Sequence, residues 1–190
     1  MSRKYTEDEI FEKIDFTQTL LDKGEYENCK FCFCDFTKAD LTEIVFVDCT
    51  FENCNLSMAE LTKTAFRDVK FNNCKMLGLL FENCNEFGLS VNFYNCNLSH
   101  ASFYKQKIKK TAFKNTKLQE TDFTECDVSS SIFDNCDLTG AVFNFTVIEK
   151  SDFRTSFNYI IDPEKNRMKK AKFSLSGLYG LLNKYDIIVE

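Results

Sequence analysis

The chain has 190 residues, of which 24 are basic and 29 acidic, giving a formal net charge of −5. This length can bury a sizeable core within one domain, and the mildly acidic balance argues against general nucleic-acid binding. No apolar stretch has the length of a signal peptide or a membrane span, so we expect a cytoplasmic protein with reduced cysteines.

Residues 1–23 are expected to form an N-terminal cap and an irregular first coil. The stretch from Thr6 to Glu9 has the pattern of a capping box and predicts a short helical start. Phe11, Phe16 and Leu21 already follow a five-residue spacing. The regular part of the fold therefore begins before residue 24.

Residues 24–157 carry a large apolar side chain at every fifth position, which we call the centre of each pentapeptide. Small residues stand two positions before most centres, and polar residues fill the remaining positions. A period of five fits neither a helix nor a flat strand. The centres are Tyr26, Phe31, Phe36, Leu41, Phe46, Phe51, Leu56, Leu61, Phe66, Phe71, Met76, Phe81, then Phe93, Leu98, Phe103, Ile108, Phe113, Leu118, Phe123, Val128, Phe133, Leu138, Phe143, Ile148 and Phe153.

This A/C-x-F/L-x-x signature resembles the pentapeptide-repeat family. The resemblance implies an all-β fold, a right-handed quadrilateral β-solenoid in which each pentapeptide forms one side and each coil takes 20 residues. Phe31, Phe51 and Phe71 then form one column of stacked rings, since neighbouring coils lie one strand spacing apart. Phe93 follows Phe71 by 22 residues, which predicts a two-residue bulge near residues 85–91.

Nine of the ten cysteines precede a centre by two positions, which predicts that they are small, buried fillers. Cys29 and Cys32 match a CxxC pattern, but no second pair has matching spacing and His100 is the only histidine. We therefore expect no metal or cofactor. No recognised catalytic motif occurs, and the carboxylates occupy outward positions, so we expect no enzymatic activity.

Residues 158–190 are expected to form an irregular last coil, a short C-terminal helix and a tail. The predicted helix over 176–184 presents an apolar face that either caps the last coil or makes a two-fold dimer contact. The ending GLYGLLNKYDIIVE is similar to the C-terminal segment of the quinolone-resistance branch of the family, which implies an end-to-end homodimer. The residues of this face are Leu178, Leu181, Leu182 and Tyr185.

Charges are segregated along the predicted rod. Residues 87–119 contain no acid but include a basic belt, whereas residues 120–149 contain no Lys or Arg but include an acidic belt. Outward charges commonly serve only solvation, but segregation by sign indicates a partner surface. The basic belt is Lys105, Lys107, Lys109, Lys110, Lys114 and Lys117. The acidic belt is Glu120, Asp122, Glu125, Asp127, Asp134 and Asp137.

Three functions fit these observations. The resemblance to the quinolone-resistance branch implies a protein-binding rod that mimics duplex DNA and binds DNA gyrase or topoisomerase IV, with the acidic belt as phosphate surrogates. The second is a structural or adaptor module for an unrelated partner. The third, direct nucleic-acid binding through the basic belt, is the least favoured because few stacking aromatics lie outside the predicted core.

Overall fold

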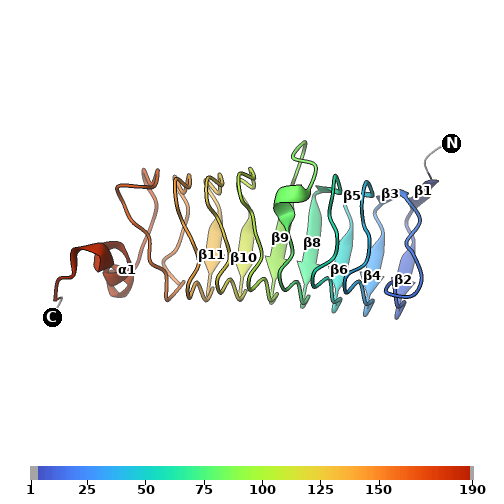
Figure 1. Ribbon diagram of the computed structural model, residues 1–190, viewed down its shortest axis with the longest axis horizontal. Helices are drawn as coiled ribbons and strands as arrows, with labels where there is room; N and C mark the ends of the chain where they lie inside the picture. The colour runs from blue at the N-terminus through green and yellow to red at the C-terminus, as the bar shows by residue number, and fades with distance from the viewer. Residues whose placement is uncertain (1–3, 189–190) are drawn as a thin grey trace.

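The computed structural model describes residues 4–188 and shows a single elongated β-solenoid closed at its C-terminal end by short helices (Figure 1). All strand pairs are parallel and form a four-stranded and a seven-stranded sheet on adjacent sides of the rod. Within residues 4–188, no helix is long and apolar enough to cross a membrane. The predicted β-solenoid fold is confirmed.

The strands are short because each coil turns a corner every five residues. The first sheet contains β1 (Lys4–Glu7), β3 (Gly24–Glu27), β5 (Val45–Val47) and β7 (Ala65–Arg67). The second contains β2 (Ile10–Glu12), β4 (Lys30–Cys32), β6 (Thr50–Glu52), β8 (Val69–Asn72), β9 (Val91–Tyr94), β10 (Ala112–Lys114) and β11 (Ile132–Asp134). The helices are the 3-10 helices η1 (Phe81–Asn83), η2 (Leu175–Gly177) and η3 (Asn183–Tyr185) and the α-helix α1 (Tyr179–Leu182).

The register between coils matches the spacing of the sequence. Phe31 pairs with Phe51, and Phe51 with Phe71, each one 20-residue coil apart. Phe71 pairs with Phe93 instead, so this coil holds the two extra residues that the spacing predicts. They form a loop that rises above the corners of the neighbouring coils (Figure 1).

The core consists of four columns of centres that stack along the rod axis. In the first column Phe113 lies between Phe93 and Phe133, with ring centroids 5.2 and 4.8 Å away. Neighbouring columns meet edge to face, as Phe113 and Phe123 do at 88°. Each fully buried centre contributes roughly 1.5–3 kcal/mol, so the columns supply most of the driving force for folding.

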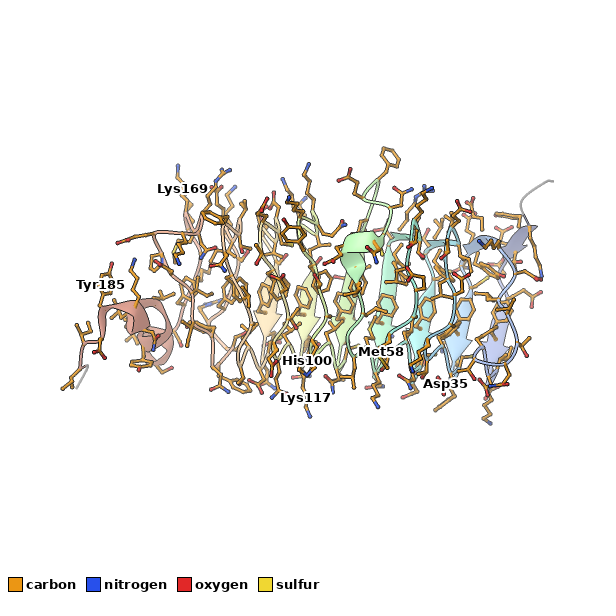
Figure 2. The ribbon with its side chains drawn as sticks, in the orientation of Figure 1. Asp35, Met58, His100, Lys117, Lys169 and Tyr185 are labelled. Atoms are coloured by element: carbon orange, nitrogen blue, oxygen red, sulfur yellow. The ribbon has the colours of Figure 1, made fainter. Side chains whose placement is uncertain are left out.

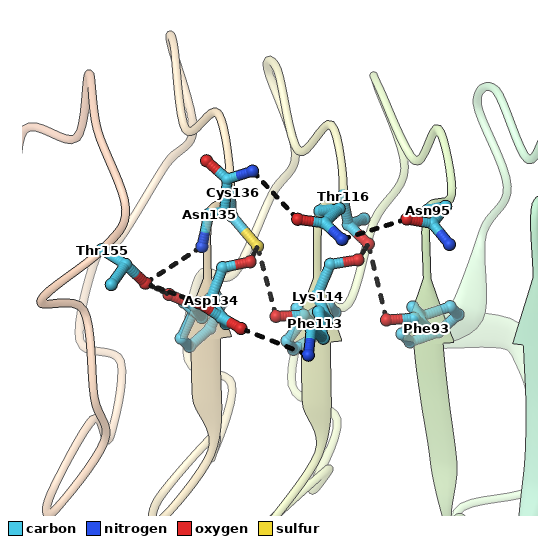
Figure 3. A network of polar contacts seen from close by, with 11 residues as sticks. Phe93, Asn95, Phe113, Lys114, Thr116, Asp134, Asn135, Cys136 and Thr155 are labelled. Atoms are coloured by element: carbon cyan, nitrogen blue, oxygen red, sulfur yellow. Dashed lines mark hydrogen bonds and ion pairs between the residues drawn. The ribbon is translucent and has the colours of Figure 1, made fainter.

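The residue two positions before each centre is a hydrogen-bond donor as well as a small filler. Cys136 Sγ donates to the Phe113 carbonyl at 3.4 Å, and Thr121 Oγ1 donates to the Leu98 carbonyl at 3.0 Å (Figure 3). Both acceptors are centres in the preceding coil. This bridging explains why Cys, Ser and Thr recur here alongside Ala, which the volume argument alone did not predict.

The residue two positions after each centre turns the corner with a positive φ. Asn95, Asn115 and Asn135 have φ of 54°, 50° and 52°, and Asn side chains tolerate this conformation well. Asn115 Nδ2 donates to Asn95 Oδ1 at 3.1 Å, and Asn135 Nδ2 donates to Asn115 Oδ1 at 2.9 Å (Figure 3). The corners are therefore tied together by side chains as well as by backbone.

The predicted helical start at Thr6 is wrong. Residues Lys4–Glu7 form β1, which pairs in parallel with β3 and places Thr6 beside Tyr26. The Asp8 amide donates to the Glu27 carbonyl at 3.1 Å, so this segment already belongs to a solenoid coil. An isolated helical turn is marginal in water, and pairing with the next coil outweighs the local capping signal.

The C-terminal helix is present but short, and it closes the last coil. Phe173 stacks on Phe153 with centroids 5.3 Å apart and so ends the first column. The Ile161 amide donates to the Gly180 carbonyl at 2.9 Å, which ties α1 to the solenoid. Gly180 is required there because a Cβ atom would collide with the carbonyl oxygen of Tyr159.

Candidate interaction surfaces

The two charged belts neutralise each other because they lie one coil apart. Lys105 Nζ lies 3.7 Å from Glu125, Lys109 Nζ lies 3.1 Å from Asp127, and Lys114 Nζ lies 3.8 Å from Asp134. Each pair is about 20 residues apart in sequence, the length of one coil. The segregation that the sequence shows along the chain therefore becomes alternation across neighbouring coils of the folded rod.

The other three residues of the acidic belt also have partners. Glu120 lies 3.3 Å from His100 Nδ1. Asp122 accepts the Thr124 amide at 2.8 Å, and Asp137 accepts hydrogen bonds from Thr139 and Asn158. Burial favours the neutral acid at Asp137, but the hydrogen bonds from these side chains outweigh it and lower the pKa of Asp137. These two aspartates stabilise corners of the rod.

A different acidic surface lies near the N-terminal end, on the side of the rod from which the loop projects. It is a shallow depression, which we call the acidic depression, and it contains five carboxylates and one lysine. Asn28 Nδ2 donates to Asp8 at 2.6 Å across the coil step. Its lining residues are Glu7, Asp8, Glu27, Asn28, Asp48, Asp68 and Lys70. The sequence did not reveal it, since these acids are 20 residues apart and interspersed with lysines in the chain.

The acidic depression lies along one edge of the rod, which we call the loop edge. It is formed by the positive-φ residues that follow the fourth column of centres. Before the loop these residues are Asp8, Asn28, Asp48 and Asp68; after the loop they are Lys110, Ser130, Lys150 and Lys170. The edge therefore changes sign at the loop. Residues 1–90 contain 17 acids and 10 bases, whereas residues 91–190 contain 12 acids and 14 bases.

The basic half of the loop edge has fewer internal partners than the belts. Lys109 and Arg167, beside the edge, pair with Asp127 and Glu149. Within residues 4–188, no carboxylate lies within ion-pair distance of Lys110, Lys150 or Lys170, and all three are exposed. Figure 2 shows Lys169, next to this edge, on the same side of the rod as the loop, with His100 and Lys117 on the opposite side.

The loop between η1 and β9 presents an aromatic side chain at the point where the two halves meet. Phe87 is 77% exposed. The Phe87 amide donates to Asn85 Oδ1 at 2.9 Å, and Ser90 Oγ donates to Asp68 at 2.8 Å. Gly88 has a φ of 72°, which favours glycine. The loop is thus anchored at both ends with its phenyl ring in solvent.

Family models match most of the repeat region of this chain. The model described as pentapeptide repeats (8 copies) matches residues 44–85, and the model described as pentapeptide repeat region matches residues 89–157. Together they cover more than half of the sequence. The chain belongs to the pentapeptide-repeat family. No curated protein matches its sequence significantly.

Solved structures of another pentapeptide-repeat protein share this fold. A trypsin-treated form of QnrB1, described as a plasmid-mediated fluoroquinolone resistance protein, aligns with a TM-score of 0.52 and 22% identity over 100% of this chain and 95% of its own. Full-length QnrB1 gives a TM-score of 0.53 and 19% identity over 97% and 100% of the two chains. This similarity shows the fold.

The C-terminal end of this pentapeptide-repeat rod divides the predicted apolar face between two roles. Leu181 packs against the core, and Leu182 is half-buried. Leu178 and Tyr185 are 40% and 51% exposed, and the Tyr185 hydroxyl donates to Glu164 at 3.0 Å. The outer side therefore remains apolar, with further exposed residues at Leu175, Tyr179, Ile187 and Ile188.

Within residues 4–188, this pentapeptide-repeat chain contains no group of three or more His, Cys, Asp or Glu side chains placed to hold a metal ion. All ten cysteines are free thiols, and the nine at filler positions are buried as predicted. Burial raises the pKa of the Cys49 and Cys136 thiols to about 12, which disfavours the reactive thiolate. The side chains available to a partner are those on the outside of the rod.

Proposed function

We propose that this chain is a non-catalytic rod that binds a protein partner through its outer surface. The filled core supports this proposal, because the four columns of centres leave the charged side chains outside, around shallow depressions only. Catalysis generally needs a pocket that holds a substrate away from water. We place the rod in the cytoplasm.

We propose a type II topoisomerase, DNA gyrase or topoisomerase IV, as the partner, with quinolone resistance as the consequence. The likeness in fold to QnrB1 supports this choice. A rigid rod with carboxylates repeated at each coil, about 4.8 Å apart, offers a regular acidic surface to an enzyme that binds duplex DNA. This is the DNA-mimic form of the proposal.

The acidic depression is the best candidate for that contact. The belt residues Glu125, Asp127 and Asp134 are already paired with lysines of the preceding coil. Asp8 and Asp48 lie in the depression, are exposed and belong to the half of the chain with excess negative charge. We therefore locate the partner-binding surface there rather than on the acidic belt.

The test is a gyrase supercoiling assay with and without a fluoroquinolone. We expect the protein to restore supercoiling in the presence of drug, Asp8→Asn with Asp48→Asn to weaken this protection, and Glu120→Gln with Glu125→Gln to leave it intact. Binding to gyrase should weaken as salt is raised. The absence of both protection and gyrase binding at low salt would refute the topoisomerase proposal.

The alternative is an adaptor module with an unrelated partner. The mutual neutralisation of the belts favours it, because a continuous negative face would serve mimicry better than cancelling charges. Pull-down with the wild-type rod and the Asp8→Asn, Asp48→Asn variant separates the two, since an adaptor retains a partner that is not a topoisomerase. Direct nucleic-acid binding is tested by a salt-dependent duplex shift.

We also propose an end-to-end homodimer through the C-terminal end. Exposed Leu178 and Tyr185 beside Leu175 and Ile188 form an apolar surface suited to a two-fold contact. Light scattering should give the mass of a dimer for the wild type and of a monomer for Leu178→Asp. Leu181→Ala, in the packed inner side, should lower stability instead. A monomeric wild type would leave α1 with a capping role only.

A further inference from the structure

The loop edge is negative on one side of the loop, positive on the other, and has an exposed phenyl ring between them. From this arrangement we propose that the loop edge is a self-complementary surface on which a second copy of this chain lies side by side and antiparallel. The contact is separate from the C-terminal end. Opposite charges would meet in it twice, because a two-fold contact repeats every interaction.

The coil geometry aligns the two halves. Four edge residues precede the loop and four follow it, each one coil from the next, as the bond from the Asp8 amide to the Glu27 carbonyl and that from the Lys150 amide to the Lys169 carbonyl illustrate. A two-fold axis across the loop therefore brings Asp68 opposite Lys110 and Asp8 opposite Lys170. Lys150 then faces Asn28, between two aspartates.

Residues beside the edge add both attraction and repulsion. Glu7 would face Lys169, which is favourable. Glu27 would face Glu149, and Arg67 would face Lys109. Glu149 and Lys109 are already paired within their own chain with Arg167 and Asp127, at 2.9 and 3.1 Å, so these like-charge contacts are attenuated. The unpaired lysines of the edge determine the balance, which is attractive.

Phe87 provides the centre of the contact. Its side chain is 77% exposed, and its loop is anchored by the bond from Ser90 to Asp68. On the two-fold axis, the Phe87 rings of two copies would pack against each other between the two charged halves. Interfaces commonly place an aromatic anchor at the centre and charged groups around it. The loop would then space the rods so that long lysine side chains reach the aspartates.

This association would cover the acidic depression. A copy lying on the loop edge would place its lysines over Asp8, Asp48 and Asp68, so a partner that binds the depression would have to displace it. Self-association would thus regulate access to this surface, whatever the partner.

Cross-linking at the loop tests the geometry. In a Cys32→Ser background, Phe87→Cys should be joined to its counterpart by a short bismaleimide at about 0.01 M salt, and the yield should fall at about 1 M salt, where the Debye length is ~3 Å. An end-to-end dimer cannot give this product, because four coils on each side hold the two loops roughly 40 Å apart. The absence of a low-salt cross-link would refute the proposal.

Charge exchange tests the complementarity. We expect Asp8→Lys with Asp48→Lys to abolish cross-linking, Lys150→Glu with Lys170→Glu to abolish it, and an equimolar mixture of the two variants to restore it, since both contacts are then attractive again. The matched control is Lys75→Glu with Lys117→Glu on the opposite side of the rod, which should cross-link like the wild-type edge.

Three results would overturn the proposal. The mixture could fail to restore cross-linking while both variants stay folded by circular dichroism. The control variant could lose it equally, which would indicate a general charge effect. Cross-linking could also require added duplex DNA, which would make the basic half a nucleic-acid surface instead.

Discussion

Phe113 and Phe133 stack with their ring centroids 4.8 Å apart and their planes inclined by 12°, and their backbones pair in the same register. The stacking distance of the rings equals the spacing of the coils, so side-chain packing and backbone pairing reinforce each other. We expect Phe113→Ala to lower the free energy of unfolding by about 3–5 kcal/mol, measured by denaturant titration. The exposed Phe33→Ala is the control, and an equal effect there would contradict the column packing.

The hydroxyl of Thr121 bridges two coils by donating to the Leu98 carbonyl, which also accepts the Ala101 amide. Because the carbonyl keeps one partner, we expect Thr121→Val to cost only about 1 kcal/mol in the free energy of unfolding. Thr124→Val, half-buried at an outward position, should have little effect. Equal stability of Thr121→Val and wild type would show that this position requires only a small volume.

Phe145 turns a corner with a φ of 53°, although bulky side chains rarely adopt this conformation. Its side chain is 69% exposed, so little packing depends on it. We expect Phe145→Asn to raise the free energy of unfolding by about 1 kcal/mol, since Asn tolerates this conformation better. Phe157→Asn is the control, because Phe157 is exposed without a positive φ. A destabilised Phe145→Asn protein would refute the strain argument.

The buried thiols should be unreactive in the folded protein. Burial raises the pKa of Cys49 and Cys136 to about 12, whereas Cys32 is half-buried. An aromatic disulfide reagent at neutral pH should label Cys32 first, and the other nine cysteines only after unfolding, as mass spectrometry would show. Cys32→Ser should remove the early product, and rapid labelling of Cys49 in native protein would contradict the structure.

Arg154 holds the pKa of the Asp152 carboxyl below its ordinary value, with its guanidinium 2.7 Å from the carboxylate. A carboxyl with a lowered folded-state pKa contributes stability above its unfolded pKa of about 3.9 and loses that contribution as pH falls through the folded value. We expect Arg154→Ala to begin acid unfolding at a higher pH than wild type, measured by thermal melts between about pH 5 and 2. Lys150→Ala should melt like wild type over this range.

The sequence alone determined the solenoid, the two-residue insertion and the burial of the filler cysteines. Each follows from linear spacing, because a repeat that contacts only its neighbouring coils converts distance along the chain directly into position. Phe71 and Phe93, 22 residues apart, locate the insertion without any coordinates.

Only the tertiary structure decided which charges meet. Lys109 and Asp127 belong to separate belts in the sequence but form an ion pair in the rod. Asp8 and Asp48 lie 40 residues apart but share one depression. Pairing between coils also made Thr6 part of a strand, where the local signal predicted a helix. Spacing fixes the inward side chains, whereas the outward ones depend on which coil lies beside them.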